Sequence, residues 1–275
     1  MKFKLLSLCF LFVSLGAYTF AKNSLPAIDK NKAAQNVEEL WAGYDPRAEP
    51  LEVQTIREWD EVYEGREIKV QMLTFTVGTF KNQVSRISAY YAYPMGMKEK
   101  VPGLVQVHGG GQRANKHMVV VDAANGYASI SLNWGGRELE DQKAGEPGTD
   151  WGAIDPTQKH VSHYFRLTPD EKTAESVYSP RNNNWFILTL ATRRGLTFLE
   201  QQPNVDAGKM GVYGHSMGEP LPGRWLDSTP ASRLRCLRAG GRESLRQKIL
   251  PALEHPPTDG WATSCTPQPS TPPHP

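Results

Sequence analysis

Residues 210–218 read Met-Gly-Val-Tyr-Gly-His-Ser-Met-Gly, and this stretch decides the fold. A short apolar run leads directly into a Gly-x-Ser-x-Gly pentapeptide. Three fixed letters in five arise often by chance, but a strand directly before them is typical of a nucleophilic serine on a sharp turn. Such a turn needs strained dihedrals, which cost ~1–3 kcal/mol, and Gly214 and Gly218 let the flanking segments close together. We therefore predict that Ser216 is a nucleophile at the carboxyl edge of a sheet.

The predicted elbow consists of Gly214, His215 and Gly218 around Ser216, with His215 expected to pack or to face substrate. The backbone N–H of Met217 is predicted to donate to the oxyanion that develops when the serine attacks a carbonyl. Losing one such donor typically costs ~2.7–4 kcal/mol of transition-state stabilisation. A working site is therefore expected to draw a second donor from another segment.

A glycine-rich loop supplies candidates for that donor. His108 and three glycines follow an apolar run upstream, and the absence of side chains lets backbone amides approach a substrate closely. We predict that the donors come from Gly110, Gly111 and Gln112. The alternatives are an ordinary tight turn between a strand and a helix for the glycines, and a core residue for His108.

Periodicity along the rest of the chain alternates between strand and helix. Apolar and polar residues alternate as in half-buried strands at 51–59 and 68–77, and 84–93 is rich in β-branched and aromatic residues. A buried strand is predicted at 103–107 and further strands at 127–132 and 210–213, and helices are predicted at 33–40, 117–125 and 184–201. Alternating strands and helices imply a doubly wound, mostly parallel sheet, here with an antiparallel N-terminal edge. Residues 137–181 have no periodicity, as is typical of a long loop that carries or covers a site.

Composition excludes several classes of protein. Among 275 residues, 39% are hydrophobic and 22% charged, which argues against wholesale disorder and against a multi-span membrane protein. The net charge of +2 gives no electrostatic case for nucleic acid. Three scattered cysteines support neither a disulfide framework nor a zinc site. His160 and His163 lack a third ligand, so no metal or cofactor is predicted, and exposed loop positions are expected for both.

The first residues have the order of a secretory signal. Lys2 and Lys4 precede an apolar run that ends at Leu15, and small residues follow as far as Ala21. The run is shorter than the ~20 residues that span a bilayer, and the alternative is a buried N-terminal helix. We predict a signal peptide at 1–21, so that the mature protein is periplasmic or secreted and has no stable membrane anchor. Residues 22–50 are polar and are predicted to form an N-terminal preamble, a surface segment that precedes the domain.

The stretch from about Leu51 to Gly218 resembles the α/β-hydrolase superfamily. It is most similar to secreted bacterial esterases of the dienelactone-hydrolase and acetyl xylan esterase type. The resemblance implies an α/β-hydrolase domain over 51–218 and ester hydrolysis through an acyl group on Ser216. It also implies a small-molecule or carbohydrate ester, such as an acetyl ester, as substrate. It rests on the residues at 107–112, 133–136, 150–155, 179–185 and 211–218.

The chain departs from this family after the serine, where the acid and then the histidine are expected on later loops. Residues 219–275 contain eleven of the twenty-one prolines, a single Ile and no Val, Phe or Tyr. Parallel strands need β-branched runs, so we predict a disordered Pro/Arg-rich tail and a sheet that lacks its last strands. A short variant of the family would instead recruit Asp227 or Asp259 with His255 or His274.

We interpret the tail as out of frame with its ancestor. Codons that the genetic code permits for residues 225–240 can be translated in a frame that starts one base earlier. The resulting peptide, LAGFDARVKAAVPSCG, has the pattern of a helix end followed by a buried strand. An active chain would be a serine esterase or, because prolyl-oligopeptidase-like enzymes share this elbow, a peptidase. Without acid and base it would be a non-catalytic remnant.

Overall fold

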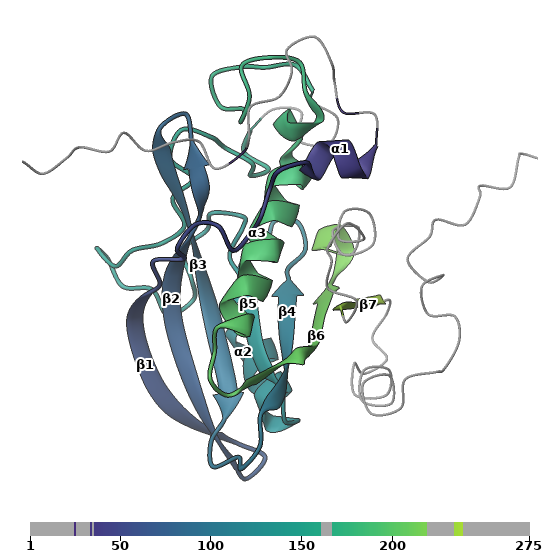
Figure 1. Ribbon diagram of the computed structural model, residues 1–275. Helices are drawn as coiled ribbons and strands as arrows, with labels where there is room; N and C mark the ends of the chain where they lie inside the picture. Colours follow the sequence, from purple (N-terminus) through teal and green to yellow (C-terminus); the bar gives the residue numbers. More distant parts are fainter. Residues whose placement is uncertain (1–24, 26–33, 35, 161–166, 219–233, 239–275) are drawn as a thin grey trace, which may run out of the picture.

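A computed structural model describes residues 25, 34, 36–160, 167–218 and 234–238 (Figure 1). Its centre is one sheet with the strand order β1-β2-β3-β5-β4-β6-β7. The strands are β1 (Gln54–Tyr63), β2 (Arg66–Phe80), β3 (Gln83–Pro94), β4 (Val101–Val107), β5 (Ala128–Leu132), β6 (Val205–Gly214) and β7 (Leu234–Arg238). β1, β2, β3 and β5 pair antiparallel in turn, whereas β5, β4, β6 and β7 pair parallel. The predicted mixed sheet with an antiparallel N-terminal edge is confirmed.

The first three strands are longer than their sequence patterns predict. β1 and β2 are joined by Glu64 and Gly65 with φ of 49° and 75°, and β2 and β3 by Lys81 and Asn82 with φ of 49° and 62°. Two-residue turns with two positive φ angles match the twist of antiparallel strands, so pairing continues up to the turn. At the junction of β1 and β2 the added residues Arg66 and Glu67 are exposed, whereas at the end of β2 the added residues, including Phe80, are buried.

Two helices cover opposite faces of the sheet (Figure 1). α2 (Lys116–Ala124) packs with Val70, Met72 and Tyr90, whereas α3 (Asn184–Glu200) packs with residues of the other face, including Leu73 and Phe75. Each helix begins at an asparagine whose side chain accepts a backbone N–H: Asn115 from Met118 at 3.0 Å and Asn183 from Trp185 at 2.9 Å. Both predicted helices are confirmed. No helix in the described ranges has the length and apolar character needed to cross a membrane.

The segment before β1 differs from the surface preamble that its polar composition predicts. Its helix, α1 (Val37–Trp41), begins later than the predicted 33–40, and Leu40 and Trp41 are buried. Trp41 stacks on Phe186 of α3 with ring centroids 4.5 Å apart. Arg194 of α3 donates to the carbonyl oxygens of Pro46, Glu49 and Pro50. These contacts make the described part of the segment an integral cover of α3.

Strand β7 lies inside the segment that the sequence predicts to be disordered and without strands. Its backbone pairs with β6 from Met210↔Leu234 to Gly214↔Arg238. The expectation that no strand follows the serine is therefore wrong at Leu234–Arg238. The rest of 219–275 and the predicted signal peptide at 1–21 lie outside the described residues.

Candidate active site

Ser216 lies two residues after Gly214, the last residue of β6, and has a backbone φ of 54°. This left-handed conformation is unfavourable for a residue with a side chain and is kept only where the surroundings enforce it. Ser216 and His215 are both exposed, and Ser216 opens the short 3-10 turn η2 (Ser216–Gly218). The strained turn predicted from the pentapeptide is present in the chain.

The two glycines of the pentapeptide lie where no side chain fits. A Cβ on Gly214 would lie 2.5 Å from the carbonyl carbon of Gly218, and a Cβ on Gly218 would lie 2.9 Å from that of Val107. Carbon atoms in contact normally lie ~3.5–4.0 Å apart. The close approach of β4, β6 and η2 therefore requires glycine at both positions.

The glycine-rich loop lies against this turn because β4 is the parallel neighbour of β6. Val107 pairs with Gly214, and the N–H of His215 donates to the carbonyl oxygen of Val107 at 3.3 Å. A Cβ on Gly109 would lie 3.3 Å from the Cβ of Ser216. A strained serine turn after a central parallel strand, beside a glycine loop from the neighbouring strand, is the arrangement of one superfamily. The described part of the chain has the α/β-hydrolase fold.

Of three comparisons with known proteins, only the one with solved structures finds similar chains. No family model matches the sequence, and no curated protein matches it. The chain is similar in structure to acetyl xylan esterase 1 from Thermoanaerobacterium sp. JW/SL YS485, with 20% identity, a TM-score of 0.47, and coverage of 70% of this chain and 54% of that one. An acetyl xylan esterase from Paenibacillus sp. R4 has 19% identity and a TM-score of 0.43, with coverage of 64% of this chain and 50% of that one. A glucuronoyl esterase from Solibacter usitatus has 14% identity and a TM-score of 0.42, with coverage of 67% of this chain and 52% of that one. The chain spans about half the length of these esterases.

Two of the backbone amides predicted as oxyanion donors already have acceptors. The N–H of Gly111 donates to Oε1 of Gln158 at 2.6 Å, and the N–H of Gln112 donates to the carbonyl oxygen of Gly109 at 3.3 Å. Gly110 lies against the Met217 side chain, where an added Cβ would overlap the Met217 sulfur. The structure thus brings Gly110 and Met217 together, whereas the N–H of Gly111 is bound to Gln158 and the N–H of Gln112 to Gly109 within the loop.

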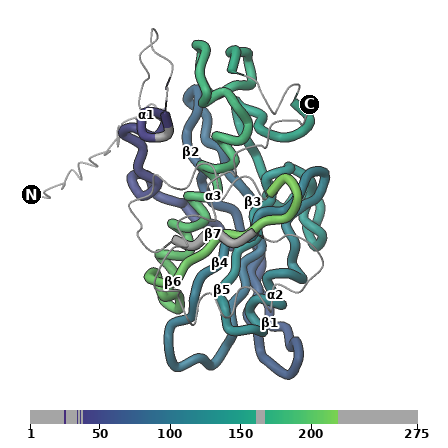
Figure 2. Tube along the Cα trace, turned by 90° about the vertical axis from the view of Figure 1, so that its right-hand side faces the viewer, coloured from purple at the N-terminus to yellow at the C-terminus, as the bar shows by residue number. Residues whose placement is uncertain are grey.

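Gln158 is a site residue that the sequence analysis missed. It comes from the aperiodic segment 137–181, and its side-chain nitrogen lies 2.8 Å from the sulfur of Met217. Figure 2 shows this segment beside the end of β6. The side-chain carbonyl of Gln158 thus accepts from the N–H of Gly111, one of the amides that the sequence predicts as oxyanion donors. No local pattern marks this residue, because its role depends on contacts 47 and 59 residues away.

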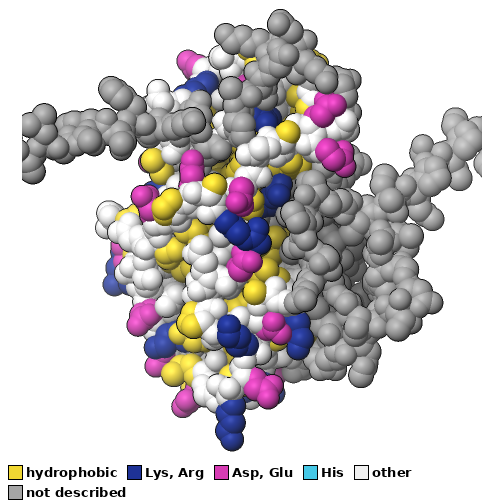
Figure 3. Space-filling view, in the orientation of Figure 1, with side chains coloured by type: hydrophobic (Ala, Val, Ile, Leu, Met, Phe, Trp, Pro, Cys, Tyr) yellow, Lys and Arg dark blue, Asp and Glu magenta, His cyan; other side chains and the backbone are white. Residues whose placement is uncertain are grey.

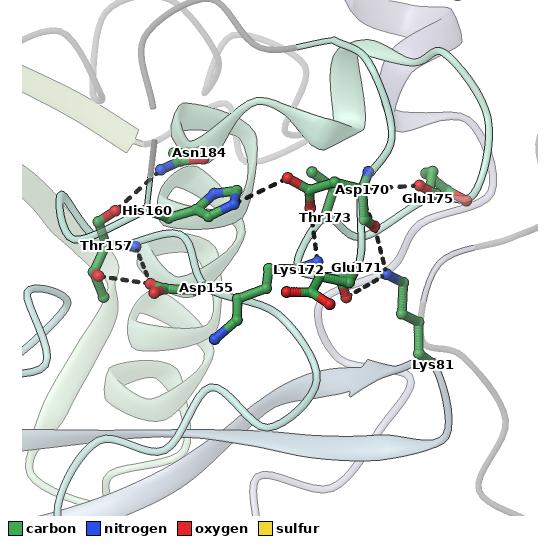
Figure 4. A network of polar contacts seen from close by, with 10 residues as sticks. All are labelled: Lys81, Asp155, Thr157, His160, Asp170, Glu171, Lys172, Thr173, Glu175 and Asn184. Atoms are coloured by element: carbon green, nitrogen blue, oxygen red, sulfur yellow. Dashed lines mark hydrogen bonds and ion pairs between the residues drawn. The ribbon is translucent and has the colours of Figure 1, made fainter. Parts of the chain in front are cut away.

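A polar network holds the segment that carries Gln158 (Figure 4). Asp155 accepts the N–H and hydroxyl of Thr157 at 2.9 and 2.6 Å, and Asn184 donates to the carbonyl oxygen of Thr157. His160 Nε2 lies 3.0 Å from Asp170 Oδ2. These contacts tie the residues on both sides of Gln158 to the rest of the fold.

His160 is not the exposed loop residue that the sequence predicts. Its side chain is only 12% exposed because it packs against the Asp170 carboxylate. The described residues contain no group of three metal-ligating side chains, and His163 lies outside them. The structure therefore assigns His160 to the support of the segment.

His108 is a structural residue of the glycine loop. Its ring stacks on Trp134 with centroids 4.7 Å apart, and Trp134 Nε1 donates to the His108 carbonyl oxygen at 3.0 Å. His108 Nδ1 lies 2.7 Å from the carbonyl oxygen of Gly109 and so donates to it, which leaves Nε2 facing the N–H of Gly135. Burial lowers the pKa of His108 to about 4, so the ring is neutral. Both ring nitrogens are engaged, and neither serves Ser216.

Asp122 of α2 is a buried carboxyl that is hydrogen-bonded to the end of β6, just before the serine turn. Asp122 accepts hydrogen bonds from Ser129 at 2.6 Å and from the Tyr213 hydroxyl at 2.7 Å. Burial raises the pKa of Asp122 to about 6 and also raises the pKa of Tyr213. Tyr213 directly precedes Gly214, so this pair fixes the strand that leads to the serine.

The described residues place no acid and no histidine base beside Ser216. Within the described ranges, no hydrogen bond joins the Ser216 side chain to a histidine. The weak candidates from the sequence all lie outside those ranges: Asp227, Asp259, His255 and His274.

Proposed function

We propose that the protein is a serine ester hydrolase that forms an acyl-enzyme on Ser216. The observation that carries the proposal is the φ of 54° at Ser216, on a turn that lies against the glycine loop. In the proposed reaction, Ser216 Oγ attacks the ester carbonyl and its proton passes to a base. The alcohol then leaves with a proton, and water releases the acyl group as a carboxylic acid.

The oxyanion donors in this proposal are the N–H groups of Met217 and Gly110. The close packing of Gly110 on the Met217 side chain supports this choice. The N–H of Gly111 would join them once the Gln158 carbonyl leaves. A donor of this kind acts by stabilising charge that exists only in the transition state.

The proposed substrate is an acetyl ester on a carbohydrate. Support comes from the resemblance of 51–218 to acetyl xylan esterases and from the structural neighbours that carry that name. Export by residues 1–21 fits this substrate class, since plant polysaccharides are met outside the cell. On the face of the molecule in Figure 3, acidic and basic side chains are intermixed rather than gathered by sign.

The second candidate is a non-catalytic remnant of a hydrolase. It is favoured because, among the described residues, no histidine is hydrogen-bonded to the Ser216 side chain. Oxyanion donors and binding alone would still supply ~10³–10⁴-fold rate enhancement over water. A peptidase of the prolyl-oligopeptidase type shares the chemistry of the elbow but would prefer amide substrates.

Hydrolysis of p-nitrophenyl acetate and of a peptidyl anilide separates these candidates. For an esterase we expect ester hydrolysis that falls at least ~10³-fold in Ser216→Ala, and a fluorophosphonate adduct on the peptide that contains Ser216. Ser176→Ala is the matched control because Ser176 is exposed and lies outside the elbow. Weak activity that Ser216→Ala leaves unchanged would identify the remnant, and preferential anilide cleavage would identify the peptidase.

A further inference from the structure

Helix α3 carries adjacent buried arginines on the side that faces α1. Arg193 and Arg194 are only 3% and 2% exposed. Burying a charge without a partner costs several kcal/mol, so each needs compensation. Arg194 donates hydrogen bonds to the carbonyl oxygens of Thr76, Pro46, Glu49 and Pro50. These acceptors are neutral, and the charge of the Glu49 side chain also acts on the guanidinium.

Arg193 has less compensation than Arg194. Its guanidinium carbon lies 4.3 Å from the ring centroid of Trp41 and 5.3 Å from that of Tyr44. Such stacking on aromatic faces offsets part of the desolvation cost. In the described part of the chain no carboxylate pairs with Arg193, and the exposed Asp45 acts on it only at longer range. The nearby Arg47 adds further positive charge, although Glu200 pairs with it at 2.7 Å.

Four buried polar atoms in this cluster have no hydrogen-bond partner. They are Nε and Nη1 of Arg193, Nε1 of Trp41 and the hydroxyl of Tyr44. The rings of Trp41 and Tyr44 lie 5.5 Å apart and the Arg193 guanidinium lies near both, so the side chains that carry the four atoms form one cluster. Three of them donate only, and the tyrosine hydroxyl donates or accepts. Native proteins rarely leave such groups unsatisfied, and each therefore points to a missing acceptor.

We propose that this cluster of Trp41, Tyr44 and Arg193 is a binding site for a small inorganic anion such as chloride, which joins α1 to α3. An anion accepts from several donors at once and also neutralises the guanidinium. A water molecule matches the cluster less well, because its own two protons would need acceptors where the side chains offer almost none. The site joins the end of α1 and the residues just after it to α3, and none of its residues belongs to the elbow (Figure 1).

Thermal unfolding in two salts at equal ionic strength tests the site. Sodium chloride is compared with sodium gluconate, whose anion is too large for a buried site. If chloride binds the folded state alone, the Tm rises by about 3–6 °C for each tenfold increase in chloride above its Kd. Identical melting in the two salts would overturn the proposal and leave buried water as the occupant.

Variants that keep the rings but remove the donors provide the specificity control. Trp41→Phe combined with Tyr44→Phe should abolish the difference between chloride and gluconate, whereas Arg47→Gln should keep it because Arg47 is paired at the surface with Glu200. A difference that survives in the double variant would refute the assignment. If the double variant fails to fold, crystals of the full chain grown in bromide decide: anomalous density within hydrogen-bond distance of Arg193 supports the site, and its absence overturns it.

Discussion

Replacing Gly214 with alanine tests the geometry on which the proposed chemistry depends. The new methyl carbon would lie 2.5 Å from the carbonyl carbon of Gly218 and 3.0 Å from its Cα. Because such carbons normally lie no closer than ~3.5 Å, β6 and η2 must separate by about 1 Å. The clash involves backbone on both sides, so no side chain can rotate away to relieve it.

Two magnitudes follow from this displacement. Overpacking of a rigid site costs ~1–3 kcal/mol or more, so the free energy of unfolding should fall by about 3 kcal/mol. A displacement of about 1 Å at the reacting atoms lowers the rate by ~10²-fold, so kcat/KM for p-nitrophenyl acetate should fall by that factor. Urea unfolding and steady-state kinetics on the same samples measure both.

Gly148→Ala is the matched control, since its methyl group would meet only the flexible end of the Gln142 side chain. Both the stability and the rate of this variant should stay close to the wild-type values. If Gly214→Ala also retained both, β6 and η2 would not approach as closely as described, and the elbow would lose its physical basis.

Two further substitutions probe groups near the elbow. Gln158→Ala removes the carbonyl that occupies the N–H of Gly111, and because such a hydrogen bond contributes ~1 kcal/mol, kcat/KM should rise about fivefold; a fall would show instead that Gln158 supports the loop. Burial raises the pKa of the Asp122 carboxyl to about 6, so the folded wild-type protein takes up a proton on acidification before the unfolded chain does and gains stability below pH 6. Asp122→Asn removes this carboxyl and with it this gain. Between pH 7 and pH 4.5 the variant should therefore lose ~2 kcal/mol more unfolding free energy than the wild type, as urea midpoints would show, and equal losses would contradict the buried carboxyl. The lowered pKa of His108 destabilises the folded state on acidification, because the unfolded chain binds that proton first. This effect is the same in the wild type and in the variant, so it cancels when their losses of unfolding free energy are compared.

The sequence was sufficient for the elements whose chemistry is local. Gly214 and Gly218 are required by backbone contacts that any serine turn of this kind makes, so their spacing identified the turn. Apolar periodicity identified the central strands and α3 for the same reason, since each element buries a face of its own. The ends of β2 and β3 at their shared turn were not predicted, because that turn is defined by positive φ angles rather than by apolar residues.

Residues whose roles depend on distant partners were not predictable in this way. Gln158 and His160 lie in a segment without periodicity, and their partners are fixed only when that segment folds over the sheet. The buried N-terminal segment shows the same limit. Its polar composition suggested a surface location, but its carbonyl oxygens are the acceptors for Arg194. A polar sequence is compatible with burial when the rest of the chain supplies the complementary donors.

Strand β7 bears on the interpretation of the reading frame. Pairing with β6 uses backbone groups that every residue except proline possesses, so Leu234–Arg238 pairs without the β-branched residues that a buried parallel strand normally contains. The alternative reading that permitted codons allow places the run VKAAV at 232–236, which overlaps this strand. A strand at this position is thus compatible with both frames, but only the alternative frame offers β-branched residues there, the valines at 232 and 236. Comparison of the nucleotide sequence with those of close relatives tests this interpretation: we expect them to encode the apolar run in frame. Relatives that share the Pro/Arg-rich tail in frame would refute it.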